Sequence, residues 1–236
     1  MIRLAAVGDL HYGVDSEGLG DHLDGLEDHA DLLLLAGDLT RVGAEEEAQA
    51  LAAELAGVSV PCISVLGNHD HHSGAASGVR RAMERAGVTV LEGEGVTVSV
   101  GGVRIGVAGV KGFGGGFAGA CGADFGEPEM KAFIRHSHHV AERLHESLES
   151  LRADIRVVLT HYAPVKDTLA GERLEIFPFL GSYLLAQAID STGADLAVHG
   201  HAHNGSEKGV TPGGVHVRNV AQPVIRSWYR VYRAQD

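Results

Sequence analysis

The chain has 236 residues, of which 44% are hydrophobic and 21% are charged, and this balance is ordinary for a globular protein. It holds 31 acidic against 19 basic residues, for a net charge of −12 at pH 7. An acidic surface repels polyanions, which disfavours a nuclease that binds duplex nucleic acid, because phosphate contacts need clustered Lys and Arg.

Domain organisation and location follow from what the sequence does not contain. No Pro- or Ser-rich linker and no charge block divides it, so we expect residues 1–236 to form a single domain. The first apolar run is too short for a signal segment, and no run approaches the ~18 apolar residues of a transmembrane helix. Cys62 and Cys121 do not make a disulfide framework. We therefore expect a cytoplasmic protein with no membrane partner.

Five short apolar runs bounded by turn residues predict strands that are buried on both faces. They are residues 2–7, 32–36, 62–66, 156–159 and 196–198. Helical patterns cover residues 45–56, 78–86, 127–152 and 179–190, with Pro128 at the start of the longest. Strands that alternate with helices predict parallel β-α-β units.

Two parts of the chain have the pattern of antiparallel strands instead. Residues 96–100 and 103–110 flank Gly101-Gly102, the pattern of a hairpin with a two-residue turn. Residues 215–219 and 228–233 look like antiparallel strands near the end of the chain. We therefore predict an α/β protein with two mixed sheets facing each other and helices outside both.

Metal-ligand residues recur in five short clusters, each placed where a predicted strand ends. The clusters are Gly8-Asp9-Leu10-His11, Gly37-Asp38-Leu39-Thr40, Gly67-Asn68-His69-Asp70, Thr160-His161-Tyr162 and His199-Gly200-His201-Ala202-His203. Loops that follow buried strands project their side chains into the crevice at the carboxyl edge of a sheet. In an extended segment, Asp9 and His11 point the same way, and so do His201 and His203.

Taken singly, each of these residues has an ordinary structural explanation. An Asp after a strand, such as Asp38, is often a turn or N-cap residue, and we expect His199 to be structural. Taken together, the clusters supply seven ligands, enough for two ions if one carboxylate is shared. The seven are Asp9, His11, Asp38, Asn68, His161, His201 and His203. Carboxylate and imidazole groups suit Mn, Fe and Zn.

Two further segments allow more than one interpretation. The Gly-rich stretch 111–119 is a substrate-facing lid or a plain connecting loop, since glycine permits close backbone approach. The stretch 135–145 holds His136, His138, His139 and His145, whose spacing favours a solvated helix face over a metal site.

The order D-x-H, G-D, G-N-H-D, H, G-H-x-H resembles the calcineurin-like metallophosphoesterase superfamily. The motifs span Asp9 to His203 and are specific as a set. The resemblance implies the metallo-dependent phosphatase fold, a four-layer α-β-β-α sandwich. It implies one ion held by Asp9, His11, Asp38 and His203, and a second held by Asp38, Asn68, His161 and His201, with Asp38 bridging.

The same resemblance implies a hydrolase in which a hydroxide bridging two divalent or trivalent ions attacks phosphorus in line with the ester oxygen. His69 is then the catalytic residue near the leaving group, and Asp70 orients its ring. Arg41, Lys111 and Phe113 are candidate substrate contacts, although a surface salt bridge explains Arg41 equally well.

The substrate is less constrained than the reaction. The size and the acidic charge favour a small phosphoester, and of the activities in the family we expect a phosphodiesterase. A phosphomonoesterase or a nucleotide pyrophosphohydrolase is the alternative. A metal-binding interaction scaffold is the non-enzymatic alternative, which the full ligand set and His69 disfavour.

Overall fold

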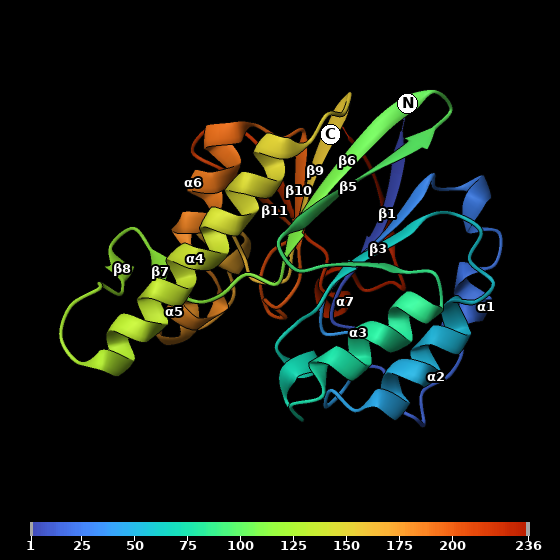
Figure 1. Ribbon diagram of the computed structural model, residues 1–236, viewed down its shortest axis with the longest axis horizontal. Coiled ribbons are helices and arrows are strands. Elements are labelled where there is room, and N and C mark those ends of the chain that lie inside the picture. The colour runs from blue at the N-terminus through green and yellow to red at the C-terminus, as the bar shows by residue number, and fades with distance from the viewer. Residues whose placement is uncertain (1, 235–236) are drawn as a thin grey trace.

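The computed structural model describes residues 2–234, which build two mixed β-sheets packed face to face (Figure 1). The first sheet has the order β13-β1-β2-β3-β4. Its strands are β1 Arg3–Val7, β2 Leu32–Ala36, β3 Cys62–Val65, β4 Thr89–Leu91 and β13 Arg230–Arg233. The second sheet has the order β11-β12-β10-β9-β6-β5. Its strands are β5 Glu94–Val100, β6 Val103–Val110, β9 Ile155–Thr160, β10 Leu196–His199, β11 Lys208–Val210 and β12 His216–Asn219.

Helices cover the outer face of each sheet (Figure 1). The first sheet packs against α1 Leu19–Leu23, α2 Glu45–Leu55 and α3 Ala76–Arg85. The second sheet packs against α4 Pro128–Ser150 and α6 Tyr183–Thr192. Shorter elements complete the chain: α5 Phe177–Leu180, α7 Gln222–Ile225, and the small hairpin β7 Gly116–Phe117 with β8 Ala120–Cys121. The predicted four-layer α-β-β-α arrangement is confirmed.

The layers follow from strands that are apolar on both faces. In β2, Leu32 and Leu34 point into the core between the sheets, whereas Leu33 and Leu35 point into the core under α1, α2 and α3. Side chains that alternate across a strand allow one short run to serve two cores. Each sheet is therefore buried on both sides, as the unbroken apolar runs predict.

Parallel pairing brings the carboxyl ends of the central strands to one edge of each sheet. Strands β1, β2, β3 and β4 run parallel in the first sheet, and β6, β9, β10 and β12 run parallel in the second. The antiparallel neighbours β13, β5 and β11 lie at sheet edges. Loops that leave the carboxyl ends of the central strands share a crevice.

One expectation about local structure is wrong, and a second holds only in part. The helix expected at 179–190 is two helices, because the chain extends at Gly181 to pair with Ala163, where a side chain would have its Cβ 2.0 Å from the Ala163 carbonyl oxygen. Ser182 then caps α6 by accepting a hydrogen bond from the Leu184 N–H. The strand expected to be antiparallel at 215–219 is β12, which does pair antiparallel with β11 but pairs parallel with β10 on its other side.

Within residues 2–234, no helix combines the length and the apolar character that crossing a bilayer requires.

Candidate metal centre

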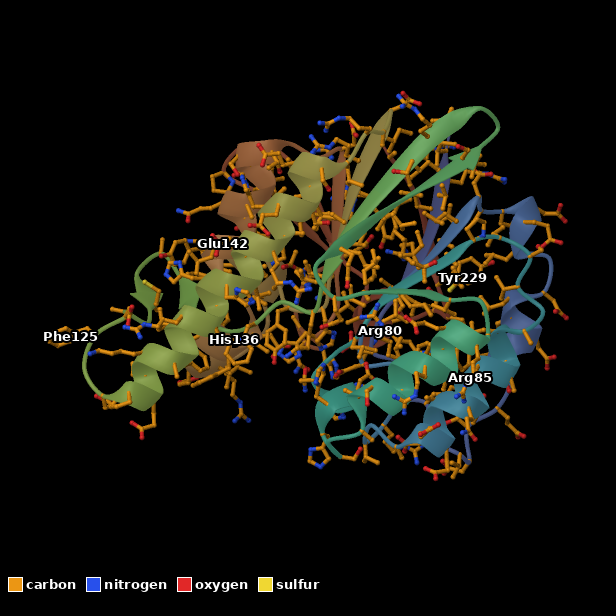
Figure 2. The ribbon with its side chains drawn as sticks, in the orientation of Figure 1. Arg80, Arg85, Phe125, His136, Glu142 and Tyr229 are labelled. Atoms are coloured by element: carbon orange, nitrogen blue, oxygen red, sulfur yellow. The ribbon has the colours of Figure 1, made fainter. Side chains whose placement is uncertain are left out.

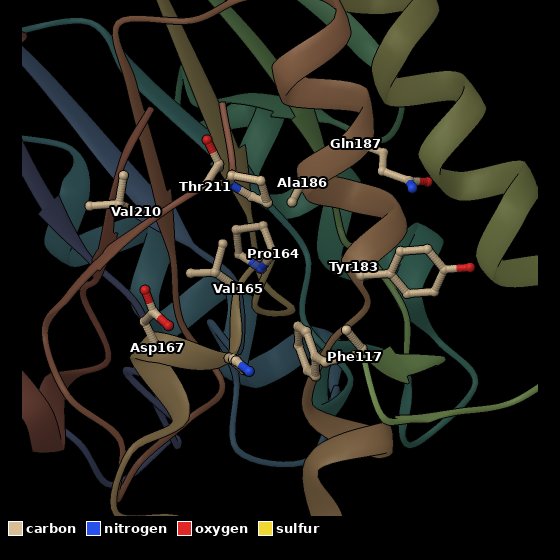
Figure 3. A pocket seen from close by; sticks show the side chains of 12 residues that line it. Phe117, Pro164, Val165, Asp167, Tyr183, Ala186, Gln187, Val210 and Thr211 are labelled. Atoms are coloured by element: carbon tan, nitrogen blue, oxygen red, sulfur yellow. The ribbon is translucent and has the colours of Figure 1, made fainter. Parts of the chain in front are cut away.

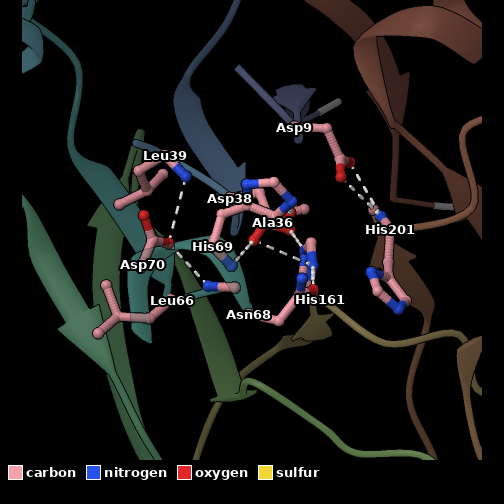
Figure 4. A network of polar contacts seen from close by, with 12 residues as sticks. Asp9, Ala36, Asp38, Leu39, Leu66, Asn68, His69, Asp70, His161 and His201 are labelled. Atoms are coloured by element: carbon pink, nitrogen blue, oxygen red, sulfur yellow. Dashed lines mark hydrogen bonds and ion pairs between the residues drawn. The ribbon is translucent and has the colours of Figure 1, made fainter. Parts of the chain in front are cut away.

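The predicted ligands come from both sheets and meet at the carboxyl ends of the central strands (Figure 4). Asp9 and His11 follow β1, Asp38 follows β2, and Asn68 follows β3. His161 follows β9, while His201 and His203 follow β10. Any ion bound among them would join the two sheets.

The backbone bends sharply at the ligands themselves. Asp9, His11, Asp38 and His201 have φ angles of 59°, 44°, 48° and 70°. Within residues 2–234, Arg226 is the one other non-glycine residue with positive φ. Asp and His enter this left-handed region more readily than most residues. The expectation that each D-x-H and H-x-H pair is extended is therefore wrong, and His201 and His203 belong to different ligand groups.

Glycines in the motifs make room for the carboxylates. A Cβ at Gly67 would lie 2.0 Å from the Asp38 Oδ1 atom, and one at Gly200 would lie 2.4 Å from the Asp9 Oδ2 atom. Both loops must pass directly over a carboxylate, which any larger side chain would prevent.

One group of ligand atoms consists of Asp9, His11 and His203, which lie within 4.8 Å of one another. The Nε2 atom of His203 is 2.8 Å from Asp9 Oδ1 and 3.5 Å from His11 Nε2. Burial alone would raise the pKa of Asp9, but the hydrogen bond from His203 and the nearby imidazoles lower it to about 2. Asp9 is therefore a carboxylate, the form that binds a cation.

A second group consists of Asp38, His161 and His201, again within 4.8 Å of one another. His161 Nε2 lies 3.4 Å from Asp38 Oδ1 and 2.9 Å from the side-chain oxygen of Asn68. Burial lowers the pKa of His201 to about 3, so that its imidazole is neutral. This group therefore brings imidazole nitrogens and oxygen atoms to one point, as a metal ion requires.

Hydrogen bonds to backbone carbonyls set the orientation of the second group's imidazoles. His161 donates from Nδ1 to Ala36 O at 2.9 Å, which leaves Nε2 free to accept. His201 donates from Nε2 to Phe179 O at 3.3 Å, which leaves Nδ1 free. Such partners fix the tautomer of a metal-binding histidine, so the donor set fits two ions of the Mn, Fe or Zn type.

Asp38 belongs to a third group as well, with His11 and His69. It is buried between the other two groups, and its Oδ2 atom lies 3.8 Å from His11 Nε2 and 3.9 Å from His69 Nε2. Among the groups found in residues 2–234, Asp38 thus has the position that a shared ligand needs.

His69 sits at the open side of the centre, with 44% of its side chain exposed. Its Nδ1 donates to the backbone carbonyl of Arg41 at 2.7 Å, so that Nε2 is the atom turned toward Asp38. The carbonyl of Arg41 is a contact that no sequence motif signals, because any residue supplies a carbonyl.

The expected role of Asp70 is wrong. Its carboxylate does not orient the His69 ring but accepts hydrogen bonds from the N–H groups of Leu39, Thr40 and Gly67 and from the Thr40 hydroxyl, at 2.6–3.2 Å. Figure 4 shows Asp70 with its contact to Leu39. Asp70 is fully buried, and its burial raises its pKa against these hydrogen bonds. It ties the loop that holds Asp38 to the loop that holds Asn68.

We expect Asp70→Asn to destabilise the protein by about 2–4 kcal/mol, because the amide NH₂ would face buried donors that it cannot accept from. For a chain of this size, the melting temperature should fall by about 5–15 °C. Thermal unfolding followed by circular dichroism measures the change, with the exposed Asp24→Asn as the matched control. An unchanged melting temperature would show that the four hydrogen bonds do not stabilise the fold.

The three candidate substrate contacts, Arg41, Lys111 and Phe113, lie in different surroundings. Arg41 forms an exposed ion pair with Asp15 at 2.8 Å, which agrees with the salt-bridge alternative. The Lys111 ammonium lies 5.4 Å and 5.6 Å from the ring centroids of Phe113 and Tyr162. Tyr162 lies beside His201, with 4.3 Å between the ring centroids. No sequence motif signals a role for Tyr162, although it stands next to His161.

His199 lies outside the three ligand groups of the described chain. It is fully buried and hydrogen-bonds to the Gly200 carbonyl at 2.7 Å and to the Thr168 hydroxyl at 2.8 Å. These contacts hold the strand end from which His201 and His203 emerge.

A cavity of about 340 Å³ lies elsewhere, beside α6 (Figure 3). Phe117, Pro164, Val165, Tyr183 and Ala186 are among its mostly apolar lining, which includes none of the seven predicted ligands. Lys166, Asp167, Gln187 and Thr211 also line it, but no ligand group found in residues 2–234 does, so the ligand groups rather than this cavity mark the candidate centre.

Comparison with known proteins tests whether the five motif clusters belong to one family. A family model described as Calcineurin-like phosphoesterase matches residues 2–205, which include all five clusters. A comparison with curated proteins finds no match.

Solved structures with the same fold include the phosphopantetheinyl hydrolase PptH from Mycobacterium tuberculosis, with 17% identity and a TM-score of 0.71 over 97% of this chain and 95% of that one. The protein TT1561 of Thermus thermophilus has 19% identity and a TM-score of 0.61, covering 99% of both chains. A putative 5′-nucleotidase from Staphylococcus aureus has 16% identity and a TM-score of 0.58 over 92% of this chain and 48% of that one. At these identities the likeness shows the fold.

Proposed function

The chain belongs to the calcineurin-like phosphoesterase family and is a metal-dependent hydrolase of phosphoesters, and we propose that its substrate is a small phosphodiester. The observation that supports this proposal is the meeting of three ligand groups, two of which contain Asp38, with the partly exposed imidazole of His69 in one of them.

We assign one ion to Asp9, His11, His203 and Asp38. The second ion is assigned to Asp38, Asn68, His161 and His201. Two such ions would supply Lewis-acid activation of water and of phosphate oxygens.

His69 is proposed to act on the leaving group. The Arg41 carbonyl accepts a hydrogen bond from Nδ1, so Nε2 is the ring nitrogen that faces the centre. In the imidazolium form Nε2 also carries a proton, which it can give to the ester oxygen as the bond to phosphorus breaks, leaving the neutral ring with its proton on Nδ1. Its exposure gives an organic leaving group room beside it. Asp38, Asn68 and their loops, tied together through Asp70, keep the distance between His69 and the ligands fixed.

The cationic groups around the centre favour a diester over a monoester. A phosphomonoester has a second negative charge near neutral pH, and arginine is the usual bidentate partner for a phosphate dianion. Here Arg41 is paired with Asp15. Burial lowers the pKa of Lys111, and the charges of Glu92 and Asp38 nearby oppose that shift. A diester monoanion needs less neutralisation.

The experiment compares bis-p-nitrophenyl phosphate with p-nitrophenyl phosphate in the presence of Mn²⁺. We expect a larger kcat/KM for the diester. A larger kcat/KM for the monoester would support the phosphomonoesterase alternative, and turnover of a nucleotide pyrophosphate alone would support the pyrophosphohydrolase. Hydrolysis of none of these compounds would favour the interaction scaffold.

We also propose that residues 1–236 act as a single domain in the cytoplasm. The core between the two sheets draws on residues from Ile2 to Ala234, so neither half of the chain has a separate core there.

A further inference from the structure

Four rings continue outward from the candidate metal centre and form what we call the aromatic wall: Tyr162, Phe113, Phe133 and His136. Tyr162 lies beside the predicted ligand His201 with 4.3 Å between ring centroids, and Phe113 is 6.0 Å from Tyr162. Phe133 and His136, both on α4, lie 4.9 Å and 4.6 Å from Phe113. The wall therefore leads from one ligand group to the surface of α4, where Figure 2 marks His136.

The loop that carries Phe113 is fixed rather than free. The carbonyl of Lys111 accepts hydrogen bonds from the N–H groups of His161 and Tyr162, both at 2.9 Å. Gly112 has a φ of 84°, and a Cβ there would lie 2.8 Å from Tyr162 Cβ, so the loop presses directly on Tyr162. The Ser137 hydroxyl donates to Gly114 O at 2.6 Å. The wall is thus preorganised, which lowers the entropic cost of binding.

The wall is open to a ligand on part of its surface. Phe113 and Phe133 are half-buried and His136 is exposed, whereas Tyr162 is 8% exposed. Lys111 is half-buried beside Phe113 and Tyr162. Burial lowers the pKa of its ammonium, and the nearby charges of Glu92 and Asp38 oppose that shift. A cation in this position, in a chain with a net charge of −12, is available to a phosphate oxygen.

We propose that Lys111 and the aromatic wall form the subsite for the organic group of the substrate, and that this group contains a flat aromatic or heteroaromatic ring. The inference rests on the proposed function, because it assumes a phosphate at the ligand groups. Lys111 binds a phosphate oxygen, and the faces of Phe113 and its neighbours stack on the ring, an arrangement that selects flat rings over alkyl groups.

The test measures binding, so that it does not depend on turnover. Benzylphosphonate, cyclohexylmethylphosphonate and methylphosphonate share the same anionic head and cannot be hydrolysed at the carbon–phosphorus bond. Isothermal titration of Mn²⁺-loaded protein gives the Kd of each. Stacking on one ring should make benzylphosphonate bind about 5- to 150-fold more tightly than methylphosphonate, and more tightly than the cyclohexyl compound of similar size.

Variants at Phe113 test whether this ring is responsible for the tighter binding of benzylphosphonate. Phe113→Leu should bring the Kd ratio of the methyl and benzyl compounds close to 1, and Phe113→Tyr should keep the wild-type ratio. Phe125→Leu is the matched control, because Phe125 is 82% exposed and lies at the far end of the next loop (Figure 2). Lys111→Met should weaken all three phosphonates by a similar factor, whereas Lys131→Met on α4 should leave them unchanged.

Three results would overturn the subsite: equal Kd values for the three compounds, equal Kd values for the benzyl and cyclohexyl compounds, or a wild-type ratio in folded Phe113→Leu. The last would show that the rings serve only to pack against one another. The proposed function fails in a different way, namely when no diester is hydrolysed by the wild-type protein, whatever the three Kd values are.

Discussion

Asp38→Asn is expected to lose both bound metal and activity, with turnover reduced by about 10³-fold or more, because Lewis-acid stabilisation is worth several kcal/mol. Asp38 belongs to two of the three ligand groups found in residues 2–234. Asparagine has one oxygen and no charge, so it cannot serve two ions. It also tolerates the left-handed backbone at this position, where φ is 48°, so the loop should keep its shape.

The measurement pairs metal content per chain, by plasma mass spectrometry, with turnover of the preferred ester. Asp24→Asn removes an exposed carboxylate of the same type and should change neither value. Two ions per chain retained by Asp38→Asn would refute the assignment of Asp38 as the shared ligand.

His69→Ala should separate chemistry from metal binding. Its ring is anchored to the Arg41 carbonyl, and our assignment gives it no metal. We therefore expect the metal content to remain at the wild-type level while kcat falls by about 10²–10⁴-fold, the usual contribution of a general acid or base.

His72→Ala is the matched control, since His72 is exposed three residues farther along the same loop. Wild-type kcat in His69→Ala would remove His69 from the mechanism. Loss of an ion in that variant would instead make His69 a ligand.

The sequence predicted the layers and the neighbourhood of the centre because both depend on short-range pattern. Runs such as 32–36 are apolar without interruption, which indicates a strand buried on both faces, and motif residues directly after such runs must lie at the carboxyl edge. The likeness of five motifs to one family supplied the rest of the ligand assignment.

The sequence does not predict contacts that the backbone makes. The partner of the His69 ring is a carbonyl, and Asp70 binds mainly to N–H groups, so neither contact leaves a mark on residue identity. His136 was expected on a solvated helix face, and it is exposed there. Its contact with Phe113 depends on how α4 packs against the Gly-rich loop, which is a tertiary property.

The bends at Asp9, His11, Asp38 and His201 set an evolutionary trade-off. A left-handed backbone costs a residue with a Cβ about 1 kcal/mol or more, whereas glycine adopts it freely. Selection for stability alone would therefore place glycine at all four positions, and the need for ligands opposes it. A descendant that abandoned hydrolysis would be released from that conflict, so glycine at these four bends should distinguish relatives that have become scaffolds from those that remain enzymes.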